Sequence, residues 1–312
     1  MSDYVNGLRN TIMGMIDAYN RGDNAMAYAR DHLKSSGTIN DTLITLIAYD
    51  LQAGTYIDFA KSNRQYNVNW CGQISEILSQ YSTSNSYVLE IGCGEATTLA
   101  GVLGNLAGKY SRGFGFDISW SRLHMANKWL EEKNVNAQLF VADLFEIPLV
   151  DNSIDIVYTS HSLEPNGGRE EEALKELLRV SSNIVVLVEP LYELANEKAQ
   201  KRMRDHGYVK GLKKVAENLG AKIIEYRLLD ECWNDLNPSG LVVLEKYPLA
   251  GKKSQYSDER LLWRCPITNT GLREFGDVFA SSDAGIVYPI LRGIPMLRGQ
   301  HAIVASKLLG TV

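Results

Sequence analysis

Cysteine is scarce in this chain of 312 residues, which has only four. The four thiols lie far apart, form no C-x-x-C pair, and are Cys71, Cys93, Cys232 and Cys265. This pattern predicts neither a disulfide framework nor a metal site, and it is typical of reduced thiols in a cytoplasmic protein.

Long hydrophobic runs and a basic excess are also missing. No stretch of eighteen or more apolar residues occurs, so no transmembrane helix is predicted. The opening residues, MSDYVNGLRNTIMGM, have no basic segment before an apolar core, so we expect no signal peptide. The formal net charge of −5 argues against a broad surface for nucleic acid or anionic lipid. The chain does have 45% hydrophobic residues, enough for one large domain with accessory pieces.

The most informative stretch is residues 87–98, which read YVLEIGCGEATT. Its apolar start predicts a buried parallel strand, and the turn Gly92-Cys93-Gly94 then leads into a helix expected over residues 95–106. Such a turn lets the backbone come close to a ligand, with N–H groups facing it. Glu90 stands just before the first glycine, and Thr97 occupies the place of the third glycine in a dinucleotide fingerprint.

The hydrophobic pattern divides the chain into three parts. Residues 1–69 predict a helical cap, with helices expected at residues 24–33 and 42–59, and a further helix is expected at residues 70–81. Residues 70–250 then alternate between strands and helices, which predicts an α/β, doubly wound, seven-stranded and mostly parallel sheet whose last strand is antiparallel. A polar linker at residues 251–258 opens a small β-rich C-terminal module, residues 251–312.

Three acids follow successive strands of this predicted sheet: Glu90, Asp117 and Asp143. Ligands bind at the carboxyl edge of an open α/β sheet, where Asp117 could accept two ribose hydroxyls and Asp143 an exocyclic amine. Taken singly, Asp117 could equally cap a helix and Asp143 could sit in a turn. Their occurrence together with the glycine turn favours a nucleotide-like cofactor.

These motifs resemble the class I S-adenosylmethionine-dependent methyltransferases over about residues 70–247. The resemblance implies S-adenosylmethionine as cofactor, with Glu90 and the Gly92-Cys93-Gly94 turn beneath its methionine part. It further implies that Asp117 holds the ribose, Ile118 packs the adenine, and Asp143 with Leu144 contacts the adenine edge. The upstream Y-D-x-x-A-x-x-Y string, which ends at Tyr56, is similar to a helix that lids the cofactor in many such enzymes, although an ordinary amphipathic helix explains it as well.

The chemistry is expected after the fourth strand, in residues 159–169, TSHSLEPNGGR. The resemblance places this segment, with Ser160, beside the transferable methyl group. His161 could act as a base or orient the acceptor, because imidazole titrates near neutral pH, and Glu164 could assist it. His161 could also simply hydrogen-bond a neighbouring loop. The segment does not read N-P-P-Y or D-P-P-Y, which departs from the enzymes that methylate amino groups of nucleic acids.

The C-terminal module resembles the small zinc-ribbon-type β-domain that accompanies some methyltransferases. The resemblance rests on LWRCPIT at residues 262–268 and GIVYPILRGIP at residues 285–295. The zinc ligands are missing, since the segment offers only Cys265 and His301, so we expect no metal.

Together these features predict methyl transfer from S-adenosylmethionine to an oxygen or nitrogen of a small polar metabolite, such as a sugar or a biosynthetic intermediate. The expected partner is a small-molecule acceptor; no membrane is expected, nucleic acid is disfavoured, and a homo-oligomer is left open. The module suggests an RNA or protein acceptor as the alternative. A nicotinamide-dependent oxidoreductase or nucleotide-binding module is disfavoured by Thr97 and Glu90.

Overall fold

The computed structural model describes residues 2–23, 25, 28–29, 41–246, 262–281 and 283–307. The expected linker at residues 251–258 lies outside the described residues, as does most of the helix expected at residues 24–33. No helix in the described part of the chain combines the length and the apolar character needed to cross a membrane.

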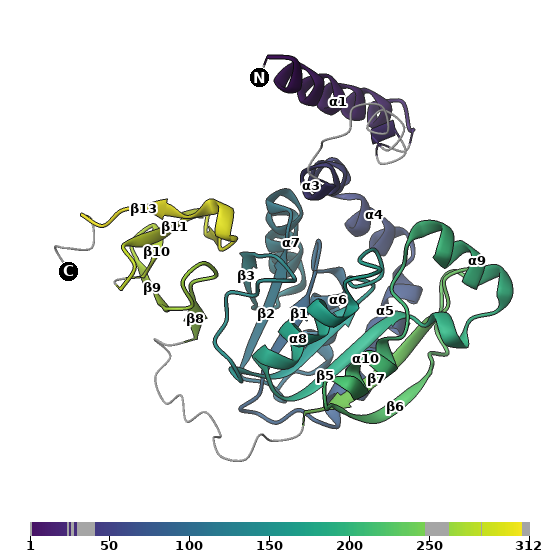
Figure 1. The fold of residues 1–312 in the computed structure, drawn as a ribbon. Coiled ribbons are helices and arrows are strands. Elements are labelled where there is room, and N and C mark those ends of the chain that lie inside the picture. The colour runs from purple at the N-terminus through teal and green to yellow at the C-terminus, as the bar shows by residue number, and fades with distance from the viewer. Residues whose placement is uncertain are drawn as a thin grey trace.

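A seven-stranded sheet forms the centre of the molecule (Figure 1), in the order β3-β2-β1-β4-β5-β7-β6. Neighbouring strands are parallel except for β7, which is antiparallel to both β5 and β6. This confirms the predicted α/β fold. The strands are β1 Tyr87–Ile91, β2 Arg112–Asp117, β3 Gln138–Val141, β4 Ile154–Ser160, β5 Ser181–Pro190, β6 Lys222–Leu228 and β7 Ser239–Glu245.

Helices cover both faces of the sheet, and their side chains bury its central strands on both sides. On one face, Tyr158 and Val186 pack with side chains of α5 Arg64–Ser79, α6 Thr97–Asn105 and α7 Trp120–Lys133. On the other face, Phe116 and Val157 pack with side chains of α8 Glu170–Val180 and α10 Leu212–Asn218. The short η1 Tyr192–Leu194 and α9 Glu197–His206 lie in the connection between β5 and α10.

The N-terminal helices differ from the expectation in two places. The single helix expected over residues 42–59 is wrong, because Gly54 adopts a left-handed φ of 106° and separates α3 Asp41–Leu51 from α4 Thr55–Ser62. The next helix, α5, begins at Arg64 instead of residue 70. Farther out, α1 Ser2–Asn20 packs against α3.

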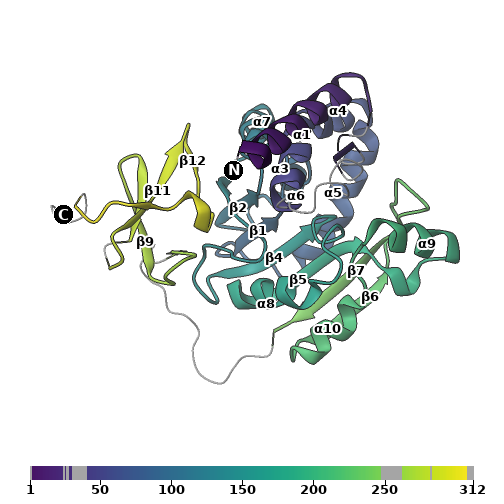
Figure 2. The same ribbon diagram turned by 45° about the horizontal axis from the view of Figure 1, so that its top comes forward.

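The C-terminal module is an antiparallel β structure that lies beside the sheet (Figure 2) and contacts β3. Its strands are β8 Trp263–Arg264, β9 Gly271–Phe275, β10 Val278–Ser281, β11 Ile286–Leu291, β12 Ile294–Pro295 and β13 Ile303–Val304. Val141 of β3 bridges to Met296, and the Leu297 N–H donates to the Val141 carbonyl at 2.8 Å. Trp263 and Phe279 join the core of the main domain. The module is therefore packed onto the edge of the sheet.

Candidate functional site

The glycine turn after β1 has left-handed backbone angles, which glycine adopts more easily than other residues. Gly92 and Gly94 have φ of 61° and 54°. A Cβ on Gly92 would lie 2.5 Å from the Cβ of Ser162, so the loop after β4 packs directly on this turn. The buried Ser162 Oγ has no hydrogen-bond partner among the described residues. A close backbone approach beside an unpaired hydroxyl is what a bound polar ligand would require.

Asp117 joins this turn to the next loop. Its carboxylate accepts hydrogen bonds from the Gly94 N–H at 3.0 Å and the Ser119 N–H at 2.9 Å. Burial raises the pKa of Asp117, although Arg122 and these N–H groups oppose the shift. The cap of α7 is Ser119, whose hydroxyl accepts the Arg122 N–H at 3.3 Å, so Asp117 is not the cap of this helix and lies instead at the carboxyl edge of the sheet.

Glu90 lies deeper, at 2% exposure, and its partner is a tyrosine. The Tyr158 hydroxyl donates to Glu90 Oε2 at 2.8 Å. Burial raises the pKa of Glu90 to about 8, despite the opposing hydrogen bond from Tyr158. Burial therefore favours the neutral form of Glu90.

The Tyr49 to Tyr56 string does reach this site, as the connection from α3 into α4. Glu95, directly after the glycine turn, accepts N–H groups of Gly54, Tyr56 and Ile57 at 3.0, 3.4 and 2.8 Å. Tyr56 itself is half exposed. Glu95 thus holds the start of α4 against the turn.

Arg122 fixes the other side of this connection. Its guanidinium lies 4.8 Å from the ring of Tyr49 and 4.7 Å from that of Tyr56, and its Nε donates to the Tyr49 carbonyl. The Ser119 hydroxyl donates to Asp50 at 2.9 Å. We call residues 49–57 the strap. They pass over the ends of β1 and β2 and form hydrogen bonds to Glu95, which follows β1, and to Ser119, which follows β2.

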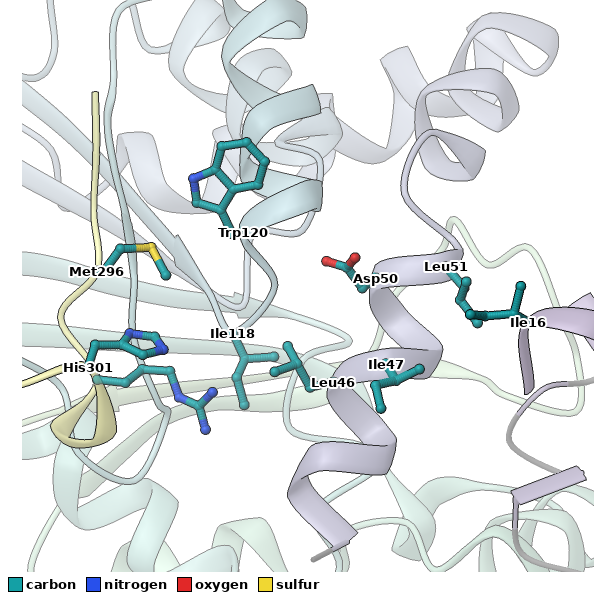
Figure 3. Close-up of a pocket in the computed structure, with 10 residues that line it drawn as sticks. Ile16, Leu46, Ile47, Asp50, Leu51, Ile118, Trp120, Met296 and His301 are labelled. Carbon is teal, nitrogen blue, oxygen red and sulfur yellow. The ribbon is translucent and has the colours of Figure 1, made fainter. Parts of the chain in front are cut away.

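The expected adenine residues lie at the ends of β2 and β3. Asp143 Oδ1 accepts the Phe145 N–H at 3.1 Å, as in a turn, while Oδ2 lies 3.7 Å from Arg298 of the module. Leu144 packs against the core. Ile118 lines a cavity of about 350 Å³ that it shares with α1, α3 and the module (Figure 3).

His161 is held on both ring nitrogens. Nδ1 lies 2.8 Å from Glu164 Oε2, and Nε2 lies 2.7 Å from the Ser239 hydroxyl. Its φ of 55° is left-handed, which is costly for a residue with a Cβ and marks functional sites in many proteins. Burial lowers the pKa of His161, but the hydrogen bond and charge of Glu164 outweigh it, so the pKa is raised above its usual value.

Glu164 and Glu189 organise the loop that carries His161. Glu164 also accepts from the Asn237 side chain at 3.1 Å, and its pKa is lowered because His161 outweighs the effect of burial. Glu189 accepts the N–H groups of Ser162, Leu163 and Glu164 at 3.0, 3.0 and 3.1 Å. Burial raises the pKa of Glu189 to about 7.

Aromatic side chains border this loop. The Trp70 indole N–H donates to the Ser160 hydroxyl at 3.3 Å, and its ring lies 5.6 Å from that of His161. Tyr66 stacks on Trp70 and also contacts Trp233, which is 59% exposed. A row of rings therefore runs from the surface to His161.

The structure brings together Glu90, the glycine turn, Asp117 and the strap at the ends of β1 and β2, and joins His161 to Glu164 after β4. Sequence reasoning missed Glu95, Arg122 and Ser239. The position of Glu95, directly after the glycine turn, could have indicated its role.

Among the described residues, no group of three or more His, Cys, Asp or Glu could hold a metal ion, and Cys265 Sγ lies 3.3 Å from the Tyr288 hydroxyl.

Known proteins resemble this chain in part of its sequence and in its fold. Residues 88–183 match the family model described as a methyltransferase domain. A solved Haloferax volcanii complex of the Trm112 methyltransferase activator with a protein described as a methyltransferase is 14% identical; the match covers 64% of this chain and 97% of that one, with a TM-score of 0.50. The Synechocystis magnesium protoporphyrin IX methyltransferase, solved with S-adenosylhomocysteine, is 13% identical over 67% of this chain and 100% of that one, with a TM-score of 0.49. A search of curated proteins finds no match.

Proposed function

We propose that this chain, whose residues 88–183 match a methyltransferase domain, is a class I S-adenosylmethionine-dependent methyltransferase that methylates an oxygen or nitrogen of a small polar acceptor. The acceptor site we propose lies between the loop after β4 and the aromatic row beside it. The observation that carries the proposal is His161, held on both ring nitrogens directly beside Trp70.

The cofactor placement we propose follows the ends of four neighbouring strands. Asp117 binds the ribose hydroxyls, and Ile118 and Asp143 with Leu144 contact the adenine. Glu90 and the glycine turn lie below the methionine part. The unpaired Ser162 hydroxyl beside Gly92 supports this placement, because it gains a polar partner when the site fills. The strap, with Tyr56, covers the cofactor from above.

S-adenosylmethionine would supply a methyl group on a positively charged sulfur. As an acceptor lone pair forms the bond to the methyl carbon, the carbon–sulfur bond would break with its electron pair staying on the sulfur, and the acceptor O–H or N–H proton would pass to water. The chain must align the acceptor with that methyl group, and alignment contributes much of the rate of such displacements. His161, with its raised pKa and its two hydrogen-bond partners, fits an orienting role better than that of a free base. Glu164 and Ser239 hold its ring, and Glu189 holds the loop beneath it.

The size of the acceptor is limited by its surroundings. Tyr66 and Trp70 offer a flat apolar surface, and the hydrogen-bonded pair of His161 and Glu164 offers polar groups directly beside it. A small molecule with one polar end for the pair and one flat or apolar face for the rings fits this arrangement.

The test uses S-adenosylmethionine labelled in its methyl group. The full chain is incubated with a cell extract separated into small molecules, RNA and protein. We expect label in the small-molecule fraction, with one S-adenosylhomocysteine released per methyl group transferred. Label confined to RNA or protein would overturn the acceptor class while leaving the methyltransferase activity in place.

A further inference from the structure

Three distant parts of the chain surround the cavity of about 350 Å³ (Figure 3). Helices α1 and α3 supply one wall, including Ile16 and Asp50. Ile118, which follows β2, and Trp120, the first residue of α7, lie between the walls. Met296 and other side chains of the C-terminal module supply the opposite wall. The cavity has the size of a small-molecule subsite.

Two nitrogen atoms of the module are buried at this cavity without a partner. Arg298 is 3% exposed, and its Nε has no hydrogen-bond partner among the described residues. The same holds for Nδ1 of His301, in the turn η3 Gly299–His301. A buried polar atom without a partner costs about 1–3 kcal/mol, so a polar ligand that reached these two nitrogens would supply a partner for each.

Arg298 also forms a long ion pair with Asp143. Its Nη2 lies 3.7 Å from Asp143 Oδ2, while the other carboxylate oxygen accepts the Phe145 N–H. With its amide turned to satisfy both partners, the Gln300 oxygen accepts from Arg298 Nη1 at 2.8 Å and Nη2 at 3.3 Å. The guanidinium is therefore fixed by the module and in turn restrains the carboxylate of the main domain.

The position of the cavity identifies what it can hold. It lies at the end of β2 and against Met296, which bridges to Val141 of β3, whereas His161 follows β4, three strand spacings away from β3. Three spacings amount to roughly 14 Å, a span suited to an extended nucleoside with an amino-acid chain. If the methyl group is at β4, the cavity is at the opposite, base end of the cofactor.

We propose that the C-terminal module forms the outer wall of the adenine subsite, with Arg298 as a positioning residue that orients Asp143 toward the exocyclic amine. This inference rests on the proposed placement of the cofactor. Met296 packs beside the base, and Arg298 Nε and His301 Nδ1 meet its polar edge. The module is then a part of the cofactor site, and no metal is needed for that role.

The experiment compares two ligands on the full chain by calorimetry. One is S-adenosylhomocysteine, and the other is S-inosylhomocysteine, in which a carbonyl oxygen replaces the exocyclic amine. Arg298→Met removes the charge and keeps the length of the side chain. We expect about tenfold weaker binding of S-adenosylhomocysteine and a similar loss of the preference between the two ligands, because a site built for an N–H donor rejects the analogue that lacks it.

Arg273→Met is the matched control, since Arg273 lies exposed on β9 of the same module. The Arg273→Met variant should bind both ligands with the affinity and the preference of the wild type. If Arg298→Met keeps both the affinity and the preference within twofold, the inference is wrong and the proposed function stands. A wild type that binds neither ligand would overturn both. Met296→Ala keeps the charge network and should weaken both ligands about equally, which tests the wall even if Arg298→Met does not fold.

Discussion

Single buried acids dominate the site at the scale of the residue. Burial raises the pKa values of Glu90, Asp117 and Glu189, and each of the three accepts hydrogen bonds from fixed donors. These bonds keep the loops after β1, β2 and β4 in place. A carboxylate here therefore serves two purposes, because it orders a loop and presents an acceptor at the edge of the sheet.

His161→Ala tests the orienting role. We expect affinity for S-adenosylhomocysteine within about twofold of the wild type and a loss of turnover smaller than 10²-fold, below the range of about 10²–10⁴ expected for a lost general base. The pH dependence of the rate should keep its shape. The measurement is turnover with the acceptor fraction found by labelling, followed across pH.

His206→Ala provides the control, since His206 is exposed at the end of α9 and should change nothing. A variant of His161 with full turnover would remove this residue from the acceptor site. A variant that instead loses cofactor affinity would place the ring on the cofactor side.

Residues that directly follow a strand could be predicted from the sequence, and residues that reach the site from elsewhere could not. Asp117 and His161 were recognised because parallel strands bring their ends to one edge. Arg122 arrives from the first turn of a helix, and Ser239 from a strand 78 residues farther along the chain. Nothing in their local sequence indicates the partner that they contact.

The same contrast holds at the scale of the element. Buried strands were predicted well, because short continuous apolar runs rich in β-branched residues are typical of buried parallel strands. The break between α3 and α4 was missed, because a single glycine is tolerated within a helix. The break depends on Glu95, which supplies acceptors for the N–H groups at the start of α4 from a different part of the chain.

Glu95→Ala should release the strap. It leaves three backbone N–H groups without their acceptor, and we expect a loss of unfolding free energy of about 2 kcal/mol, since hydrogen bonds to charged groups contribute about 1.5–3 kcal/mol each and water replaces part of them. Amide hydrogens of residues 54–57 should exchange at least about tenfold faster. Hydrogen exchange with peptide-level resolution measures this directly.

Glu132→Ala is the control for the strap, because Glu132 forms a surface ion pair with Lys61 of the same helix α4. Surface pairs contribute little, so exchange at residues 54–57 should stay as in the wild type. Equal exchange in Glu95→Ala and the wild type would show that other contacts hold the strap.

At the scale of the whole molecule, the carboxyl edge of the sheet is enclosed by segments from both ends of the chain. The strap lies over β1 and β2, and the C-terminal module packs beside β3. The sequence indicated that a module exists, but its place on the sheet depends on a bridge between Val141 and Met296, which lie far apart along the chain. Sequence patterns within one segment carry no signal for such a contact.

Buried acids also give the whole molecule a pH dependence with a definite sign. The folded pKa of Glu90 is about 8 and that of Glu189 about 7, both above the ordinary value of 4.5. Between pH 4.5 and these values the folded chain binds more protons than the unfolded chain, so stability falls as pH rises, by up to about 1.4 kcal/mol per pH unit for each group. The pKa of His161 is also raised, so the stability that its protonated form contributes is likewise lost as pH rises above 6.5.

We therefore expect the melting temperature of the chain without cofactor to fall between pH 5.5 and 8. Glu90→Gln should flatten this fall, because the amide oxygen still accepts from Tyr158 and no longer titrates. Glu132→Gln, at an exposed position, should keep the wild-type slope. A wild-type melting temperature that stays constant or rises over this range, or a Glu90→Gln variant with an unchanged slope, would contradict the raised pKa of Glu90. Differential scanning calorimetry across pH measures both slopes on the full chain.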